Sequence, residues 1–501
     1  MRKQQQRQIL ELIQTIKEVQ YKGLYADCQD GAVSVGQFIE VIEGEGTRTV
    51  ALLEEYCDLL FKAHNGEIND KPLRKQLYKI ATSVTTELKP NKFKALFLPY
   101  YDNTWETMKS VYEAFSRDPM FETQVVIMPI LRNTNEGEKF VWEDYLSPVG
   151  IHNTHYDAYY IAEDLPDVVF YNQPYDGVNI PQFQSQNIRK YADLMVYIPY
   201  GISPVNVLGE VYEKNYTKLE SIQRCDIYIA QSESFRERYT KGTSLHKKAL
   251  ALGNPKCDSL YFAKIHGEFT HFPEWESAIG NCRVILLNTH YSYMLEDVAP
   301  HPGVRRLINA VADNDNLFLI WRPHPQAFLM KMSASMQVML DFAQEHKRMI
   351  VDRTPSITPA YMYANAIVSL FPSTIVMDAL FLDLPVFLMG CEGSEHVRDE
   401  YTKQLFYDAT THEDFDNPLP DDGADAESMR MYTEQSIFAP LDAFLHEIEN
   451  DEDPKREARA EFRMREFPNL NGSIAMQVLK HVKGMCGKSD VGSETDDLIQ
   501  L

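Results

Sequence analysis

The sequence of 501 residues contains no Cys-x-x-Cys pair and no apolar run of 18 residues. Its seven cysteines are widely scattered and odd in number, which disfavours a disulfide framework or a zinc site and favours a reducing compartment. Without a long apolar run, nothing is expected to cross a membrane. The start, Met1 to Arg7, is polar and lacks the apolar core of a signal peptide. We therefore expect a cytoplasmic protein, and we leave open a peripheral contact with the inner face of the cell membrane.

Positive charge is also scarce. Lys and Arg number 49 against 73 Asp and Glu, so the formal net charge is −24. This balance argues against a nucleic-acid binder and against adsorption of the whole protein to anionic lipid. With 44% hydrophobic and 24% charged residues, the composition is that of an ordinary globular protein. The length corresponds to roughly three domains.

The most informative stretch runs from Leu317 to Gly390. It contains short apolar runs that are bounded by turn residues and separated by helical lengths, at 317–321, 349–351, 366–370 and 384–389. This pattern is typical of βαβ units and predicts a parallel sheet. In open α/β sheets, ligands bind outside the carboxyl ends of the strands. The polar residues that follow these runs are therefore expected to face one crevice: Arg322, His324, Ser373 and Thr374.

The residue types at these strand ends suit an anionic ligand. Ser373 and Thr374 open a helix, where hydroxyls and free backbone N–H groups bind anions. Arg322 supplies a planar fork of donors that fits phosphate. His324 lies between two prolines, which stiffen its loop. Each residue also has a purely structural interpretation, as a helix cap or a surface loop residue, and only their combination at neighbouring strand ends favours a site.

Residues 1–90 are expected to be helical, because apolar residues recur there at helical spacing. Asp27 to Gly31 is interpreted as a break between the first two helices, and Pro72 is expected near the start of the fourth. The simplest interpretation is a packing domain without chemistry. The alternative is a module that docks the acceptor or faces a membrane.

A second βαβ series is predicted upstream of the first, over residues 91–250. Its expected strands are Lys94–Pro99, Val125–Ile130, Asp167–Tyr171, Leu194–Ile198 and Asp226–Ala230. Polar residues again follow the strands, including Asp102, Asn172, Tyr175, Asp176 and Tyr200. The segment Leu131 to Glu163 is interpreted as a long loop that serves as a lid or a partner surface.

The predicted domain order follows from these patterns. We expect a helical domain at 1–90, a Rossmann-like domain at 91–250, a second Rossmann-like domain at 251–436, helices at 437–486 that pack back on the first half, and a disordered tail at 487–501.

Several motifs are similar to those of the CDP-glycerol glycerophosphotransferase family, whose enzymes polymerise teichoic acid. Arg322-Pro-His-Pro325 matches the family's Arg-Pro-His-Pro directly. Looser similarities are Gly253-Asn-Pro-Lys-Cys-Asp258 to Gly-x-Pro-Arg-Asn-Asp, Leu287-Asn-Thr289-His-Tyr to Pro-Thr-Phe-Arg, Ser373-Thr374 with Asp378 to Asp-Tyr-Ser-Ser-x-x-x-Asp, and Leu384-Pro-Val-Phe-Leu to Lys-Pro-Ile-Phe. The family's acidic Asp-Tyr is Phe371-Pro372 here, and its Trp-His-Gly has no clean match.

The resemblance implies a GT-B architecture, an α/β fold in which two Rossmann-like domains face a cleft, with the helical region as an extension. It implies that the domain at 91–250 binds the acceptor and that the domain at 251–436 binds the nucleotide donor. It implies transfer of a polyol phosphate, such as glycerophosphate, from a CDP-activated donor to an acceptor hydroxyl that is lipid-linked or polymeric, in cell-wall or surface polymer synthesis. No cofactor and no bound catalytic metal are expected, and loosely used Mg²⁺ stays open. The nucleotide and phosphate ligands are then Arg322, Ser373, Thr374, Lys256, Asn254 and Thr289. The catalytic candidates are His324, Asp176 and Asp102, and the acceptor side includes Asn172, Tyr175 and Tyr200.

Two other functions compete with this one. The same architecture serves glycosyltransferases that use a nucleotide sugar and release a nucleoside diphosphate instead of CMP. A protein that binds a nucleotide or polymer without turnover is the third interpretation, and Phe371-Pro372 and the missing His of the family motif motivate it.

Overall fold

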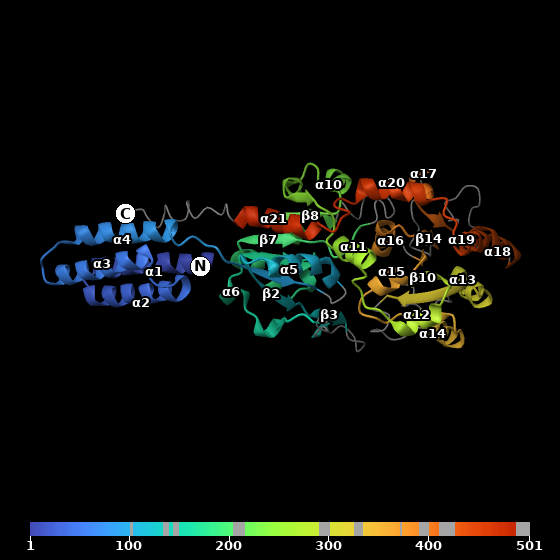
Figure 1. Cartoon of the computed structure of the whole chain (residues 1–501), viewed down its shortest axis with the longest axis horizontal. Coiled ribbons are helices and arrows are strands. Elements are labelled where there is room, and N and C mark those ends of the chain that lie inside the picture. The colour runs from blue at the N-terminus through green and yellow to red at the C-terminus, as the bar shows by residue number, and fades with distance from the viewer. Residues whose placement is uncertain are drawn as a thin grey trace.

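The computed structural model describes residues 1–100, 104–133, 140–143, 150–203, 216–289, 301–324, 334–370, 373–389, 400–409 and 426–486. The candidate base Asp102 and the expected disordered tail at 487–501 lie outside these ranges. Three bodies follow one another along the long axis of the molecule: a helical bundle, a first sheet domain and a second sheet domain (Figure 1). No helix in the described ranges is long and apolar enough to span a bilayer.

The bundle is formed by four helices with a core of their own, α1 (Lys3–Tyr21), α2 (Tyr25–Glu43), α3 (Arg48–His64) and α4 (Asp70–Thr86). Thr47 and Asn69 accept backbone N–H groups and begin α3 and α4. The expected break at Asp27 to Gly31 is wrong, because these residues lie inside α2. A Cβ at Gly31 would come 3.1 Å from Ile16 of α1, so the close passage of α1 favours a residue without a side chain at this position.

The first sheet domain contains a seven-stranded parallel sheet in the order β5-β2-β1-β6-β7-β8-β9. Its strands are β1 (Phe93–Leu98), β2 (Phe121–Ile127), β5 (Thr154–His155), β6 (Val168–Tyr171), β7 (Leu194–Tyr197), β8 (Ile227–Ala230) and β9 (Ala249–Ala251). The helical segments of this domain are η1 (Trp105–Thr107), α5 (Lys109–Arg117), η2 (Tyr156–Ala158), α6 (Ile161–Asp164), η3 (Asp176–Val178), η4 (Pro181–Phe183), α7 (Ser185–Tyr191), α9 (Glu220–Gln223), α10 (Glu233–Tyr239) and η5 (Ser244–Lys247). Both faces of the sheet are buried, which explains why its central strands β1, β6, β7 and β8 are buried at every position, whereas β2 exposes Glu122 near its start.

The segment from Leu131 to Glu163 is not one long loop. The structure places an antiparallel hairpin there, formed by β3 (Ile130–Asn133) and β4 (Phe140–Glu143), followed by β5, η2 and most of α6.

The second sheet domain contains a six-stranded parallel sheet in the order β12-β11-β10-β13-β14-β15. Its strands are β10 (Arg283–Thr289), β11 (Leu317–Pro323), β12 (Met349–Val351), β13 (Ala366–Ser369), β14 (Val386–Leu388) and β15 (Tyr407–Asp408). Its helices are α11 (Lys256–His266), α12 (Pro273–Ile279), α13 (Pro302–Asp313), α14 (Ala334–Glu345), α15 (Thr358–Tyr363), α16 (Thr374–Leu382) and α17 (Glu400–Leu405). The expected fold class is confirmed: an α/β protein of GT-B-like type with two Rossmann-like domains and an all-helical amino-terminal region.

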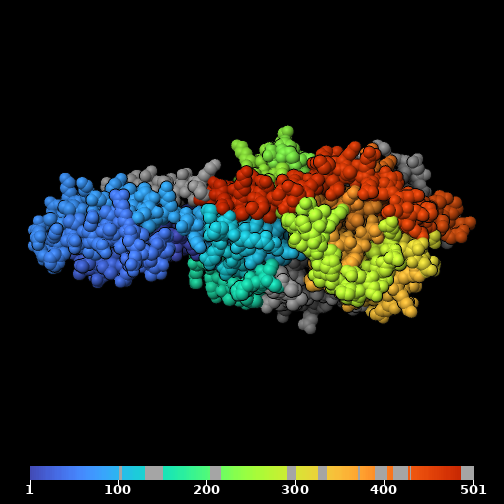
Figure 2. Space-filling view, in the orientation of Figure 1, coloured from blue at the N-terminus to red at the C-terminus, as the bar shows by residue number. Residues whose placement is uncertain are grey.

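The carboxyl-terminal helices run along both sheet domains (Figure 2). They are α18 (Ala426–Thr433), the π-helix η8 (Glu434–Phe438), α19 (Ala439–Glu449), α20 (Arg456–Glu466) and α21 (Ile474–Cys486). The last of them packs against α5 of the first domain, where Lys483 forms an ion pair with Asp118 at 2.7 Å. At its other end, the Asp258 carboxylate of α11 accepts the backbone N–H groups of Ile474 and Ala475.

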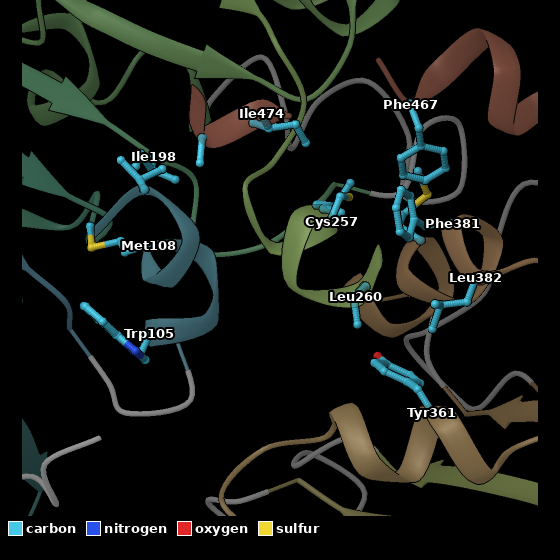
Figure 3. Close-up of a cluster of buried hydrophobic side chains, with 14 of the residues drawn as sticks. Trp105, Met108, Ile198, Cys257, Leu260, Tyr361, Phe381, Leu382, Phe467 and Ile474 are labelled. Carbon is cyan, nitrogen blue, oxygen red and sulfur yellow. The ribbon is translucent and has the colours of Figure 1, made fainter. Parts of the chain in front are cut away.

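One hydrophobic core is shared by the two sheet domains. It extends from Trp105 and Ile198 in the first domain, through Cys257 and Leu260 of α11, to Phe381 in the second (Figure 3). Because this core is continuous, the two domains are held in a defined relation to each other.

Candidate functional site

The two parallel sheets define where a ligand is expected. The strand order reverses between β1 and β6 in the first sheet and between β10 and β13 in the second. Ligands of open α/β sheets bind at such switch points, outside the carboxyl ends of the strands. In the second sheet, Thr289 ends β10, His324 follows β11 and Ser373 comes after β13. All three therefore lie at the same edge of the sheet.

The amino-terminal end of α16 forms the centre of the candidate site. Ser373 is the N-cap residue, yet its side chain makes no capping hydrogen bond within the described chain. The backbone N–H groups of the first turn and the adjacent hydroxyls of Ser373 and Thr374 are the groups that bind an anion at a helix start. The sequence prediction of a strand followed by a helix at this position agrees with the structure.

The first domain approaches this helix start directly. A Cβ built on Gly201, which follows β7, would come 2.5 Å from the Thr374 hydroxyl. Only a residue without a side chain fits such an approach. The polar strand ends of the two domains therefore meet, with Gly201 and Thr374 at the point of contact, which we call the junction.

Asn254 and Lys256 connect the junction to the second domain. The Asn254 side chain, which is 2% exposed, donates to the carbonyl oxygens of Pro199 at 2.8 Å and Gly201 at 3.4 Å. Its amide oxygen accepts the backbone N–H of Lys256 at 3.0 Å and so fixes the start of α11. The Lys256 ammonium forms an ion pair with Asp378, one helical turn beyond Thr374 on the same face of α16.

Asp378 is the centre of a buried polar cluster. The carboxylate is fully buried, and Tyr361 donates its hydroxyl to Oδ2 at 2.7 Å. Oδ1 has no hydrogen-bond partner within the part of the chain that the structure describes. Burial and the neighbouring Asp378 raise the pKa of Tyr361 well above its ordinary value, and the positive charge of Arg322 acts in the opposite direction. Burial, again with Asp378, raises the pKa of the Cys257 thiol.

Arg322 is placed at the expected strand end, but its guanidinium is bound by its own domain. It forms a buried ion pair with Asp352 at 2.6 Å and donates to Thr354 Oγ1 at 3.1 Å. Weaker contacts reach the backbone carbonyls of Ser356 and Pro355. These contacts hold the loop that follows β12, and none of them involves Ser373 or Thr374.

Thr289 and His324 lie beside each other. The backbone N–H of His324 donates to the Thr289 carbonyl at 3.2 Å. The Thr289 side chain is fully buried, and its hydroxyl accepts a hydrogen bond from the Trp321 indole N–H at 3.2 Å. This bond joins the end of β10 to β11.

The acceptor-side candidates differ in how their polar groups are used. Asn172 is buried at the switch point of the first sheet, where its amide accepts from Tyr100 N and donates to Thr104 O. Asp176 accepts the backbone N–H of Ser185 at 2.8 Å and its hydroxyl at 2.6 Å. It also lies 3.4 Å from Arg224.

Tyr175 and Tyr200, the other two acceptor-side candidates, have exposed side chains, each at 39%. Both follow strands of the first sheet, after β6 and β7 respectively.

Two residues, Tyr361 beside Asp378 and Asp352 beside Arg322, were not selected from the sequence. Tyr361 lies in a short helix after Pro359 and has the pattern of an ordinary core residue, so nothing local marks its bond to Asp378. Asp352 follows an apolar run, but its pairing with Arg322 across 30 positions has no sequence signal. Among the described residues, no three His, Cys, Asp or Glu side chains are grouped to hold a metal ion.

Comparisons with known proteins give similarities of overall structure. No family model matches the sequence, and no curated protein matches it. Among solved structures, the chain is similar to the wall teichoic acid polymerase TagF, with 14% identity, a TM-score of 0.49 and coverage of 89% of this chain and 99% of that one. A UDP-N-acetylglucosamine 2-epimerase has 10% identity and a TM-score of 0.49, covering 80% of this chain and 98% of its own.

The UDP-GlcNAc 2-epimerase from Neisseria meningitidis, bound to UDP-GlcNAc, has 13% identity and a TM-score of 0.44, covering 78% of this chain and 100% of its own. Each is a protein that this chain is similar to at low identity, and none assigns it a substrate.

Proposed function

We propose that this protein is a transferase that moves a polyol phosphate from a CDP-activated donor to an acceptor hydroxyl, in the synthesis of a cell-wall or surface polymer. The observation that carries the proposal is the uncapped start of α16, which lies at the switch point of the second sheet and against Gly201 of the first domain. An activated diphosphate placed there is within reach of groups from both halves.

In this proposal, the donor diphosphate is bound by Ser373, Thr374 and the first N–H groups of α16. In the reaction, the acceptor oxygen forms a bond to the transferred phosphorus, the bond to the bridging oxygen breaks, and CMP leaves with the added negative charge. Donors that are already oriented toward that charge stabilise the transition state. The Lys256 ammonium lies close by, where Asp378 holds it one turn into the same helix.

His324 and Thr289 form the second wall of the donor site in this proposal, and His324 is the candidate that binds the phosphate or protonates the leaving group. Arg322 contributes mainly by holding the loop after β12, because Asp352 and Thr354 occupy its guanidinium.

The acceptor is assigned to the first domain, near Asn172, Tyr175 and Tyr200. A general base there contributes about 100-fold to 10,000-fold in rate. Asp176 can serve only if it exchanges its bonds to Ser185 and Arg224 for one to the acceptor, whereas Asp102 precedes η1 in a segment outside the described residues.

The test combines product analysis with nucleotide titration. The protein is incubated with CDP-glycerol, CDP-ribitol and UDP-sugars, and the released nucleotide is identified. CMP supports phosphate transfer, whereas a nucleoside diphosphate indicates a glycosyltransferase and refutes the proposal.

In calorimetry, Ser373→Ala and Thr374→Val should each weaken CDP binding by about tenfold, because a hydrogen bond to a charged group is lost. Thr86→Val, an exposed site at the end of α4, is the matched control. Equal CDP affinity in all three variants would remove the α16 start from the donor site.

A further inference from the structure

A pocket outside the junction opens in the first sheet domain. Its volume is about 500 Å³, which is within the range of small-molecule sites. It is lined by residues of η2, η4 and their neighbours: Tyr156, Asp157, Tyr160, Ile180, Pro181 and Gln182. The segment η2 directly follows β5, and η4 belongs to the connection from β6 to α7. The pocket is therefore built by two connections that leave the carboxyl edge of the first sheet.

The exposed residues of this pocket are held in place by buried neighbours. Tyr160 is 59% exposed, but Tyr159 beside it is 3% exposed and donates its hydroxyl to Asp164 at 2.7 Å. On the opposite wall, Pro181 is exposed while Phe183 is buried and stacks on Tyr159 at 6.2 Å. Each wall is therefore anchored in the core of the first domain.

The two walls are also joined to each other. The Gln182 amide donates to the Tyr156 carbonyl oxygen at 3.2 Å. The backbone N–H of Asp157 donates to His155 Nδ1 at 3.2 Å, and the His155 ring lies 4.4 Å from the Tyr156 ring. The local turn is thus fixed, with Asp157 directed to solvent at 73% side-chain exposure.

The chemistry of the lining selects among ligands. Apolar surface comes from the rings of Tyr156 and Tyr160 and from Ile180 and Pro181. The Asp157 carboxylate supplies two acceptor oxygens, and the Gln182 amide can both donate and accept hydrogen bonds. None of the described residues that line the pocket is basic, and Asp157 carries a negative charge, so the lining offers no favourable charge to a phosphate. A ligand with an apolar face, a rim of hydroxyls and no charge fits this surface. A sugar ring has that construction, with C–H groups on its face and hydroxyls at its edge.

We infer that this pocket binds an uncharged sugar ring. The inference goes beyond the proposed function, because that function places a charged diphosphate at the junction, whereas this pocket takes a neutral ring in the first domain. A saccharide held here would be retained by the first domain independently of the nucleotide.

The test measures saccharide binding in the full chain with maltotriose and N,N′-diacetylchitobiose as probes, by saturation-transfer NMR and calorimetry. At least one probe should bind, and Tyr160→Ala should weaken it by about tenfold, since a stacking surface is removed. Tyr21→Ala is the matched control, because Tyr21 lies in the bundle with nearly the same exposure, 58%. Asp157→Asn should also weaken binding, by loss of charge-assisted hydrogen bonds.

Several results would overturn the inference. The first is that neither probe binds, and the second is that Tyr160→Ala binds the saccharide as tightly as the unchanged protein does. The third is that glycerol 3-phosphate displaces the saccharide, which would indicate an anion site. CDP titration of Tyr160→Ala runs in parallel and should give an unchanged affinity. A protein that binds the saccharide but not CDP would refute the proposed donor while leaving the sugar site in place.

Discussion

Asp258 offers a sharp test of how the last helix is held. Its carboxylate is 1% exposed and accepts the N–H groups of Ile474 at 3.1 Å and Ala475 at 2.8 Å. Burial raises the pKa of Asp258 to about 6 from an ordinary value of 3.8, although the two N–H bonds act to lower it. When α21 opens, this carboxyl returns to water and regains its ordinary pKa. The pH therefore controls how firmly the start of α21 is held.

The direction and size of the effect follow from proton binding. Between about pH 4 and pH 6, the closed state holds a proton that the open state has released, so raising the pH through this window lowers the free energy of opening. A shift of about two pKa units corresponds to roughly 3 kcal/mol. Asp258→Asn is neutral at every pH. We compare the free energy of opening of α21 in the unchanged protein with that in the variant. The difference between the two should fall by roughly 3 kcal/mol from about pH 4 to pH 7.

Hydrogen–deuterium exchange of the α21 amides, corrected for the intrinsic rate at each pH, gives the measurement. Asp118→Asn is the control at the other end of the helix. Burial acts to raise the pKa of Asp118, but the hydrogen bonds from Lys483 and the Met120 backbone N–H, together with the charge of Lys483, outweigh it, and the pKa lies below its ordinary value of 3.8. The difference between this variant and the unchanged protein should therefore stay constant over the same window. A constant difference for Asp258→Asn as well would refute the reasoning.

Three further predictions concern other parts of the fold. Burial lowers the pKa of His301 to about 4 from 6.5, so the free energy of unfolding should fall as the pH drops from about 6.5 to 4. In thermal unfolding, His301→Gln should abolish that fall. Asp352→Ala leaves the Arg322 guanidinium buried without its partner and should cost about 3–5 kcal/mol in denaturant unfolding, more than replacement of both residues by apolar ones. Gly201→Ala would place a Cβ 2.5 Å from the hydroxyl it faces and should weaken CDP binding in calorimetry. Gly177→Ala, where a Cβ would meet no atom within 4 Å, should leave CDP binding unchanged.

The strands were predictable because they are buried on both faces. A parallel strand between two layers must be apolar throughout, so runs such as Leu317 to Trp321 and Val125 to Ile127 mark their own positions. The order of these runs and of the helices between them also fixes the parallel arrangement. The placement of Ser373 and Thr374 at a helix start followed from the same reasoning.

Features that depend on distant partners could not be predicted in this way. Gly31 is typical of a turn, and the close passage of Ile16, which favours a residue without a side chain inside α2, is not visible in the local sequence. The pairing of Arg322 with Asp352 depends on the neighbouring positions of β11 and β12 in the sheet, which the sequence does not display. The contact between Gly201 and Thr374 joins two domains, so no local pattern contains it.

The position of α21 has a consequence for the order in which the protein is completed during synthesis. Its apolar side covers α5 of the first domain, yet the ribosome makes α21 only after the entire second domain. At roughly 5–20 residues per second, that delay is on the order of tens of seconds. During this interval the nascent first domain presents the face of α5 that α21 finally covers. Chaperones that recognise apolar surface should therefore be retained on the nascent chain until its last helix emerges.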